Sequence, residues 1–433
     1  MRHRPSASRR QFLKVAAASA LAAPYLVAAP LRGAAAPSNR ITLGFIGVGG
    51  RNSGHLNMCC GLSELQVLAV CDVDSARLTR ARQSVASAYA SRNPAASGKQ
   101  CVAYNDFREL LARDDIDAVF IGTPDHWHAL ISIAAAKAGK DIYCEKPLTV
   151  FPAEGPAVID AVRRHNRVLQ VGSQERSGRG GHLACELVRN QRIGKLHTVR
   201  VTLPVAHGDP PAQAERPVPP GFDYDMWLGP APFSPYVPGR THGSFRFVLD
   251  YSGGEMTDRG AHVGDIALWG CWPFLKGPTT IEGKGVFCTG LFDTARQFRV
   301  QFDYASGVRL IVESVEPRGI RFEGDRGWIF CAIHGGALSA SSPDILQTPI
   351  RPDEIRLYRS PGHQRDFFNA VRSRGEVVAP PEEGHKSAML CHLSNIALRL
   401  GRKLTWDHER EVFINDPEAN RLLVRPMRSP WTL

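Results

Sequence analysis

The sequence of 433 residues lacks several patterns that define common protein classes. None of its 10 cysteines are spaced Cys-x-x-Cys, which weakens zinc-ribbon and thioredoxin-type interpretations. Ten cysteines in so long a chain also do not make a small disulfide scaffold. After residue 36 there is no run of about 18 consecutive apolar residues, so we expect no membrane span in the mature protein. There are no internal repeats and no metal-binding cysteine pairs.

Acidic residues are absent from residues 1–36, which hold six basic ones. The whole chain has 53 Lys and Arg against 42 Asp and Glu, a net charge of +11. Without this segment the counts are 47 and 42, so only +5 remains for the rest of the chain. No basic cluster with interleaved aromatics occurs, and nucleic acid is therefore not an expected partner.

The same first 36 residues have the three parts of an export signal. A charged stretch at 8–14 precedes a short apolar stretch at 15–31, and small residues follow at 34–36. Arg9 and Arg10, followed after one Gln by Phe-Leu-Lys, resemble the twin-arginine signal. That resemblance implies the twin-arginine export machinery as a partner and a periplasmic location. An amphipathic or disordered tail is the alternative.

Short β-branched runs alternate with helical stretches from residue 41 onward. The runs that predict strands are 41–46, 67–71, 118–121, 142–144 and 168–171. Strand and helix alternating with short links indicate parallel strands with crossover helices. The near-continuous apolar runs fit a sheet that is covered on both faces. We therefore predict an α/β Rossmann domain over residues 40–172.

A glycine pair follows the first predicted strand. In a dinucleotide fold, Gly47 would permit the tight turn and Gly49 the close approach of a pyrophosphate. Asp72, 25 positions after Gly47, ends the second strand, where a carboxylate accepts ribose hydroxyls and repels a 2′-phosphate. NAD is therefore favoured over NADP, although Arg77 nearby weakens that inference. The third glycine position holds Asn52, a departure from the pattern.

Two further loops follow predicted strands, where open α/β sheets bind ligands. They are Thr123-Pro124-Asp125-His126-Trp127-His128 and Glu145-Lys146-Pro147. The first is expected to face the cofactor, since two histidines are too few for a metal site. Lys146 is positioned to donate a hydrogen bond to the substrate oxygen. The alternative is a surface lysine paired with Glu145.

The second half of the chain predicts an α+β domain over residues 173–433. Residues 204–240 contain ten prolines and five aromatics, which suggests an ordered wall over a ligand site. A plain surface crossover is the alternative. Strands predicted at 298–303, 308–315, 320–323 and 328–332 read as an antiparallel sheet, and helices are predicted at 181–193, 364–373 and 385–400.

Asp258 and His262 would lie at i and i+4 on one helix face. A carboxylate that orients an imidazole makes a general base near neutral pH. The alternatives are a helix N-terminus with a satisfied histidine, or a metal site that also uses Asp265.

These motifs together resemble the Gfo/Idh/MocA oxidoreductases, to which glucose–fructose oxidoreductase and inositol dehydrogenase belong. The resemblance implies a Rossmann domain followed by a domain with a largely antiparallel open sheet, and a homo-oligomer. It implies Lys146 and His262 as catalytic residues and Asp258 as the partner of His262, with Trp227 joining them at the substrate. The residues implied at NAD(P) are Gly47, Gly49, Gly50, Arg51, Asp72, Thr123, Pro124, His126, His128, Glu145 and Lys146.

The resulting hypothesis is hydride transfer between NAD(P) and a secondary hydroxyl of a sugar, cyclitol or glycoside. Free NAD is not expected outside the cytoplasm, so an exported enzyme must carry NAD with it or use none. We expect tightly bound NAD that is reset within the site. Two substrates acting in turn would reset it. Transient oxidation followed by elimination would also reset it, which would resemble the family's NAD-dependent glycosidases. A non-catalytic sugar-binding subunit is a further alternative. No metal is predicted.

Overall fold

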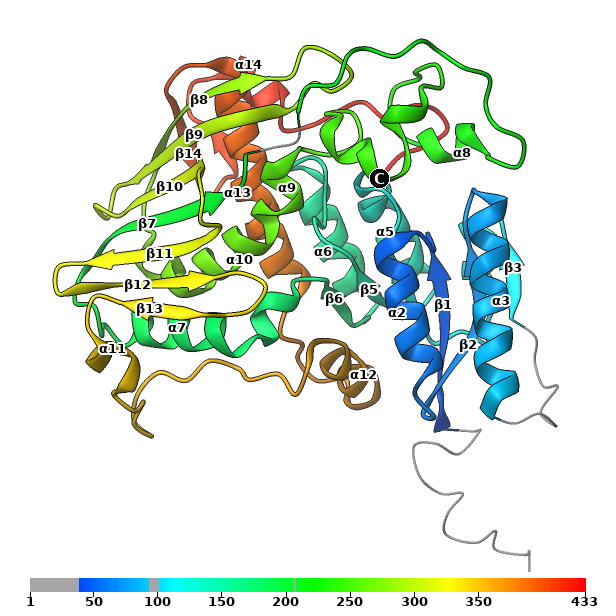
Figure 1. The fold of residues 1–433 in the computed structure, drawn as a ribbon, viewed down its shortest axis with the longest axis horizontal. Helices are drawn as coiled ribbons and strands as arrows, with labels where there is room; N and C mark the ends of the chain where they lie inside the picture. Colours follow the sequence, from blue (N-terminus) through cyan, green and yellow to red (C-terminus); the bar gives the residue numbers. More distant parts are fainter. Residues whose placement is uncertain (1–38, 93–100, 206–207) are drawn as a thin grey trace, which may run out of the picture.

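The computed structural model describes residues 39–92, 101–205 and 208–433, so the predicted export signal lies outside the described residues. The chain forms two units that lie side by side (Figure 1). One is built on a parallel sheet, at the right of the figure, and the other on a large, mostly antiparallel sheet, at the left. Among the described residues, no helix has the length and hydropathy that crossing a membrane requires.

The first unit is an α/β Rossmann domain, as predicted. Within the described residues its six strands are all parallel, in the order β3-β2-β1-β4-β5-β6. The strands are β1 (Ile41–Ile46), β2 (Leu65–Cys71), β3 (Val102–Tyr104), β4 (Ala118–Ile121), β5 (Asp141–Cys144) and β6 (Leu169–Val171). The helices are α2 (Gly50–Cys60), α3 (Ser75–Arg92), α4 (Phe107–Leu111), α5 (His128–Lys137) and α6 (Glu154–Arg164). Because the strand order reverses between β1 and β4, a crevice forms there at the carboxyl ends of the strands.

The core of this domain recruits a helix from far along the chain. Phe120 in β4 stacks on Phe45 and Tyr143, with ring centroids 4.9 and 4.7 Å apart. Helix α12 (His363–Ser373) adds Phe367 and Phe368 to the same cluster, and both side chains are fully buried. The predicted domain boundary at residue 172 therefore leaves out a helix that packs on the first sheet.

The second unit is the predicted α+β domain. In the described part of the chain its sheet has nine strands, in the order β13-β12-β11-β7-β10-β9-β8-β14-β15. Only the β7–β10 pair among these is parallel. The strands are β7 (Leu196–Leu203), β8 (Thr279–Phe287), β9 (Ala295–Tyr304), β10 (Arg309–Ser314), β11 (Gly319–Gly324), β12 (Gly327–Ala332), β13 (Leu338–Ala340), β14 (Leu404–Asp407) and β15 (Val412–Phe413).

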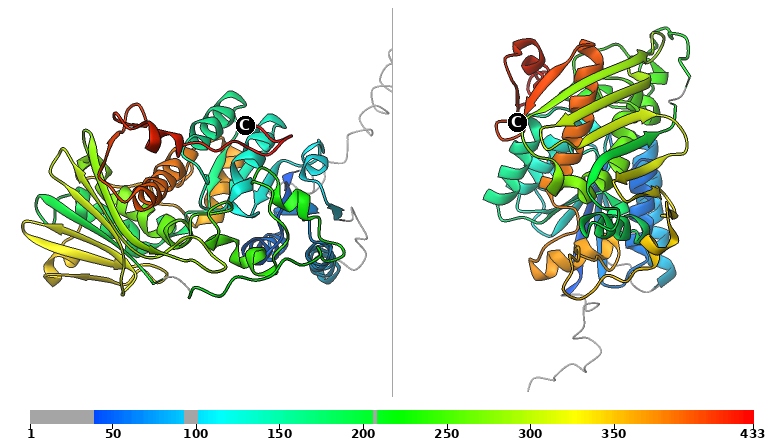
Figure 2. Two further views of the ribbon diagram at one scale, coloured as in Figure 1. Left: turned by 90° about the horizontal axis from the view of Figure 1, so that it is seen from above. Right: turned by 90° about the vertical axis from the view of Figure 1, so that its left-hand side faces the viewer.

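Helices cover the face of this sheet that is turned toward the Rossmann domain, and Figure 2 shows the orange α13 there in the view from above. They are α7 (Arg179–Arg189), α10 (Gly260–Cys271) and α13 (Pro381–Leu400). The short helix α9 (Glu255–Asp258) comes directly before α10. The buried positions alternate along β7 and β9, as expected for strands with one covered face. The two short helices α11 (Pro343–Gln347) and α14 (Pro417–Arg421) complete the unit.

The proline-rich segment crosses from the second unit to the first. Asp223 donates its backbone N–H to the Val73 carbonyl, and Gly221 accepts one from Ser75, each at 2.9 Å. Helix α8 (Tyr224–Leu228) follows and lies over the first sheet in Figure 1. Four of its five aromatic side chains, those of Phe222, Tyr224, Trp227 and Tyr236, pack in one buried cluster, whereas Phe233 is exposed. The part of the segment around α8 therefore packs against the first unit, as expected for a wall, while residues 211–221 are exposed.

Replacing Phe367 by Ala tests whether α12 belongs to the Rossmann core. Removing a fully buried phenylalanine should lower the free energy of unfolding by about 3–5 kcal/mol. Phe233, which is 72% exposed, is the control, and its replacement by Ala should change stability by less than about 0.5 kcal/mol. Urea denaturation followed by tryptophan fluorescence measures both. Equal effects of the two substitutions would contradict the packing described above.

Candidate active site

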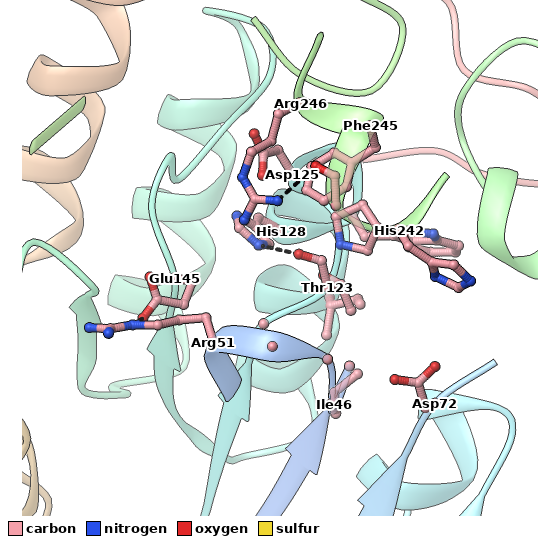
Figure 3. A pocket seen from close by; sticks show the side chains of 18 of the residues that line it. Ile46, Arg51, Asp72, Thr123, Asp125, His128, Glu145, His242, Phe245 and Arg246 are labelled. Carbon is pink, nitrogen blue, oxygen red and sulfur yellow. Dashed lines mark hydrogen bonds and ion pairs between the residues drawn. The ribbon is translucent and has the colours of Figure 1, made fainter. Parts of the chain in front are cut away.

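A cavity of about 620 Å³ opens at the carboxyl ends of the parallel strands, between the Rossmann sheet and the second unit. Figure 3 shows the turn after β1 crossing it, with Asp72 on one side and Arg51 and Glu145 on the other. Residues from both units line it. Among those predicted from the sequence are Gly47, Gly49, Gly50, Arg51, Asp72, Thr123, Pro124, His128, Glu145, Lys146, Trp227, Asp258 and His262.

Glycine is required at the first position of this turn. Gly47 has a φ of +72°, and a Cβ there would lie 2.7 Å from the backbone nitrogen of Thr123. Helix α2 begins at Gly50 with Gly49 as its N-cap, so free backbone N–H groups of its first turn face the cavity. A Cβ at Gly50 would meet nothing within 4 Å, which leaves an open approach for an anionic group.

Asn52 takes the place of the third glycine without opening the turn. Its Nδ2 donates to the carbonyl oxygens of Ile46, Gly47 and Phe120, at 3.2, 2.9 and 3.2 Å. The space for its side chain comes from Gly122 across the sheet, where a Cβ would lie 2.6 Å from the Asn52 Cβ. The close helix–strand packing that the third glycine normally allows is therefore provided by Gly122.

Asp72 stands at the end of β2, where the sequence placed it. Its Oδ2 accepts the backbone N–H of Val48 at 2.8 Å and its Oδ1 that of Asp74 at 2.9 Å. Burial raises the pKa of this carboxyl above its ordinary value, although these two hydrogen bonds act in the other direction. Arg77 extends over the glycine turn, and its Nη1 lies 2.7 Å from the position of a Cβ on Gly49.

One residue predicted to face the cofactor points elsewhere. His126 is fully buried with its Nε2 2.9 Å from the Trp227 carbonyl oxygen, and burial lowers its pKa to about 3. The 3-10 turn η4 (Asp125–Trp127) directs its ring under α8 and away from the cavity. His128 does line the cavity, where its ring nitrogens contact the carbonyl oxygens of Pro147, at 2.7 Å, and Thr123, at 3.0 Å. It braces one predicted cofactor loop against the other.

The carboxylate of Glu145 is bound by side chains on the Rossmann side of the cavity. Its Oε1 lies 2.8 Å from Nε2 of His55, 2.9 Å from Nε2 of Gln174 and 3.3 Å from Nε of Arg51. Burial favours the neutral carboxyl, but His55 and the charge of Arg51 hold the pKa of Glu145 well below its ordinary value. Glu145 is therefore an anion whose partners are these three side chains, which removes the alternative of a surface Lys146–Glu145 pair.

Lys146 instead reaches across to the second unit. Its Nζ donates to the Asp258 backbone oxygen at 2.6 Å and to Asp258 Oδ1 at 2.9 Å. Arg246 donates to the same Oδ1 at 3.1 Å. Burial opposes ionisation of Asp258, but the charges of Lys146 and Arg246 hold its pKa well below the ordinary value. The Asp258 carboxylate therefore balances two cations.

Asp258 and His262, predicted as a pair, make no hydrogen bond with each other in the described part of the chain, and Asp258 is bound instead by Lys146 and Arg246. Helix α9 ends at Asp258 and α10 starts at Gly260, with Arg259 between them also in a helical conformation, and both side chains line the cavity. Among the described residues, His262 Nδ1 has no hydrogen-bond partner. Asp265 is also elsewhere, because it binds Arg176 through both carboxylate oxygens, at 2.7 and 2.8 Å. The three ligands of the alternative metal site are therefore not brought together.

His262 lines the cavity together with Lys146. Burial, and then the positive charge of Lys146, hold the pKa of His262 well below its ordinary value. The ring is therefore neutral at pH 7 and has a nitrogen available to accept a proton.

Several lining residues have no signal in the sequence. Helix η7 (His242–Phe247) contributes His242, Phe245 and Arg246, which Figure 3 shows above the glycine turn. Glu175, in the 3-10 turn η5 (Gln174–Ser177), and His334, in the β12–β13 loop, join them. The tertiary fold brings these residues together. The single local pattern that indicates the loop of His334 is the Gly335–Gly336 pair, which is typical of a tight turn.

Sequence models of one family match most of the chain. The model described as "Oxidoreductase family, NAD-binding Rossmann fold" matches residues 41–173. The model described as "Oxidoreductase family, C-terminal alpha/beta domain" matches residues 210–433. The chain belongs to the Gfo/Idh/MocA oxidoreductase family. Its first unit is therefore an NAD-binding Rossmann domain of this family.

Curated relatives match part of the chain. A glycosyl hydrolase family 109 protein of Shewanella pealeana is 31% identical over 205 residues, which is 44% of each chain. An alpha-N-acetylgalactosaminidase of Shewanella oneidensis is 31% identical over 156 residues, 36% of this chain and 33% of the relative. The match therefore spans less than half the length of these curated relatives.

Solved structures share the whole fold. The WlbA dehydrogenase of Bordetella pertussis, in complex with NADH and UDP-GlcNAcA, aligns with a TM-score of 0.60 at 15% identity. The alignment covers 84% of this chain and 98% of the WlbA chain. A levoglucosan dehydrogenase in complex with NADH gives 0.61 at 20% identity, with the same coverage. At these identities the likeness concerns the fold.

Replacing Lys146 by Met tests the electrostatic link to His262. Removing the neighbouring positive charge should raise the pKa of His262 toward its ordinary value, because the imidazolium then meets less repulsion. Proton–carbon NMR of the His262 ring, followed through a pH titration, measures this. Lys137→Met, an exposed residue outside the cavity, should leave the titration of His262 unchanged. An unchanged pKa of His262 in Lys146→Met would contradict this electrostatic link.

Proposed function

We propose that the protein catalyses hydride transfer between NAD and a secondary hydroxyl of a sugar, cyclitol or glycoside. The observation that carries the proposal is that Lys146 and His262 line the same cavity, close enough for the ammonium charge to lower the pKa of the imidazole. A hydroxyl oxygen placed there receives a hydrogen bond from the ammonium and gives its proton to the neutral imidazole. NAD, when bound, supplies the redox step by taking up the hydride or returning it.

The ammonium of Lys146 has one N–H group left for a substrate. It carries three donors, and the backbone oxygen and Oδ1 of Asp258 accept two of them. Two fixed hydrogen bonds orient the third, which is what the positioning of a reacting oxygen requires. Asp258 thus acts through Lys146, and not by binding His262 as the sequence had predicted. Its charge, like that of Glu145, still favours the imidazolium that forms.

The cofactor end supports NAD over NADP. The residues present fit a dinucleotide, since Gly47 admits no side chain and the N-terminus of α2 faces the cavity. The Asp72 carboxyl at the end of β2 accepts ribose hydroxyls and disfavours a 2′-phosphate. Arg77 lies beside the glycine turn, where it offers a donor to the pyrophosphate.

The names of the curated relatives favour a second outcome of the same chemistry. An alpha-N-acetylgalactosaminidase among them supports a glycosidase that oxidises its substrate transiently, eliminates the leaving group and returns the hydride. The net reaction would then be hydrolysis. The paired Lys146 and the neutral His262 favour either reaction over a non-catalytic sugar-binding subunit.

Export and assembly are further parts of this proposal. The twin-arginine pattern supports a periplasmic enzyme that leaves the cytoplasm folded, with NAD already bound. A homo-oligomer is proposed on the resemblance alone.

Replacing Lys146 by Ala should lower turnover by at least about 100-fold, because the oxygen loses its positioning donor. NAD content should stay near that of the wild type, since the glycine turn and Asp72 are untouched. The measurement is reduction of bound NAD by a panel of sugars, followed at the nicotinamide absorbance band. The exposed Lys137→Ala is the control and should react as the wild type. Wild-type rates in Lys146→Ala would contradict the assigned role.

Protein purified from the exported fraction should contain about one NAD per chain. We expect this because an enzyme outside the cytoplasm has no pool of free NAD to draw on. Denaturation followed by enzymatic assay of the released nucleotide measures it. Export without bound nucleotide would contradict the closed redox cycle.

A further inference from the structure

A histidine–carboxylate pair, Glu175 and His334, lines the cavity beside His262. His334 Nδ1 lies 2.6 Å from Glu175 Oε1, and the His334 backbone N–H is 3.5 Å from Glu175 Oε2. Both residues line the cavity together with His262 and Lys146. The hydride-transfer step described above uses neither of them.

Each member of this pair is held by a different unit. Glu175 follows β6 at the edge of the Rossmann sheet, and His334 lies in the loop between β12 and β13 of the second sheet. Gly336 in that loop packs against Gly180 at the start of α7, where a Cβ would meet the Gly336 oxygen at 2.0 Å. This contact holds the loop against the start of α7 and thereby fixes the position of His334. His334 itself has a φ of +61°, which is in the left-handed region. For a residue other than glycine this conformation costs about 1–2 kcal/mol.

The orientation of the ring suits an acid–base group. Since Nδ1 faces a carboxylate, it carries the proton, and the lone pair of Nε2 is left to accept one from a ligand. The His334 side chain is 48% exposed and that of Glu175 18%, so the ring stands at the open side of the cavity. Its centroid is 5.5 Å from that of His262, with the rings at 72°. One sugar ring can therefore meet both histidines.

We propose that His334, oriented by Glu175, is a second proton acceptor and donor of this active site, acting on a carbon next to the one that is oxidised. The inference rests on the proposed function. Oxidation of a hydroxyl releases one proton, which His262 accepts. A second base is needed when a second proton must leave, and a new carbonyl makes the neighbouring C–H acidic enough for a histidine to remove it.

When each proton and electron pair is followed through the reaction, the outcome is cleavage of a glycoside. His262 takes the hydroxyl proton as the hydride passes to NAD. His334 then takes the proton from the neighbouring carbon, the C–H electron pair becomes a C=C bond, and the bond to the glycosidic oxygen breaks. His334 returns its proton to that leaving oxygen. Water adds across the C=C bond, and the hydride and the His262 proton return to the carbonyl. One water is consumed, and there is no net oxidation.

Replacing His334 by Asn separates the two proton transfers, because Asn tolerates the left-handed backbone but is no base. The probes are 4-nitrophenyl glycosides, including the α-N-acetylgalactosaminide, added to holoenzyme in D₂O. Reduction of bound NAD should stay within about 3-fold of the wild type. Deuterium uptake at the adjacent carbon and nitrophenol release should both fall by at least about 100-fold. A parallel loss of all three signals, or exchange that persists in the variant, would overturn the proposal.

Two measurements separate chemistry from folding. Added imidazole should restore exchange to His334→Gly, which a purely structural role would not allow. In cofactor-free protein, ¹⁵N NMR should find the His334 proton on Nδ1, and Glu175→Gln should weaken that preference and slow exchange. His165→Asn, an exposed histidine outside the cavity, is the matched control and should leave every signal unchanged.

The outcomes distinguish this inference from the function on which it rests. If no glycoside or free sugar reduces the bound NAD, the proposed function fails and this inference fails with it. If the wild type reduces NAD but shows neither deuterium uptake nor nitrophenol release, hydride transfer stands and the role of His334 is overturned.

Discussion

The ion pair between Lys146 and Asp258 joins the two units of the molecule at the point where the ligand must lie. Lys146 follows the last residues of β5, and Asp258 is the final residue of α9, so the pair fixes one sheet relative to the helices that cover the other. Both side chains are largely buried, and removing one partner would leave the other charge uncompensated. This contact therefore ties the two units together at the wall of the cavity.

The same pair sets the charge state of the site. Because Asp258 is engaged by Lys146 and Arg246, it is not hydrogen-bonded to His262, and the imidazole remains neutral beside an ammonium. Glu145 is kept ionised by partners within its own domain and adds a negative charge that favours a proton on His262. In the proposed reaction, a fixed donor and an available acceptor would face one substrate oxygen, which is the arrangement that reversible hydride transfer requires.

Much of this site follows from local sequence patterns. Gly47, Asp72 and Lys146 each come directly after a buried strand, and the parallel sheet brings such positions to one edge. The pairing of Asp258 did not follow, since it depends on Lys146 and Arg246 arriving from other segments of the chain. The orientation of His126 likewise depends on α8, more than 90 residues later. The packing of α12 on the first sheet and the meeting of His334 with Glu175 are products of tertiary structure alone.

The central claim is that one substrate oxygen contacts both Lys146 and His262. A crystal structure of the holoenzyme with a bound, unreactive sugar analogue measures it most directly. We predict a single sugar oxygen within about 3.2 Å of both Lys146 Nζ and a ring nitrogen of His262, with its carbon facing the nicotinamide. A sugar whose oxygens contact neither side chain, in a complex that retains the Lys146–Asp258 pair, would contradict the account.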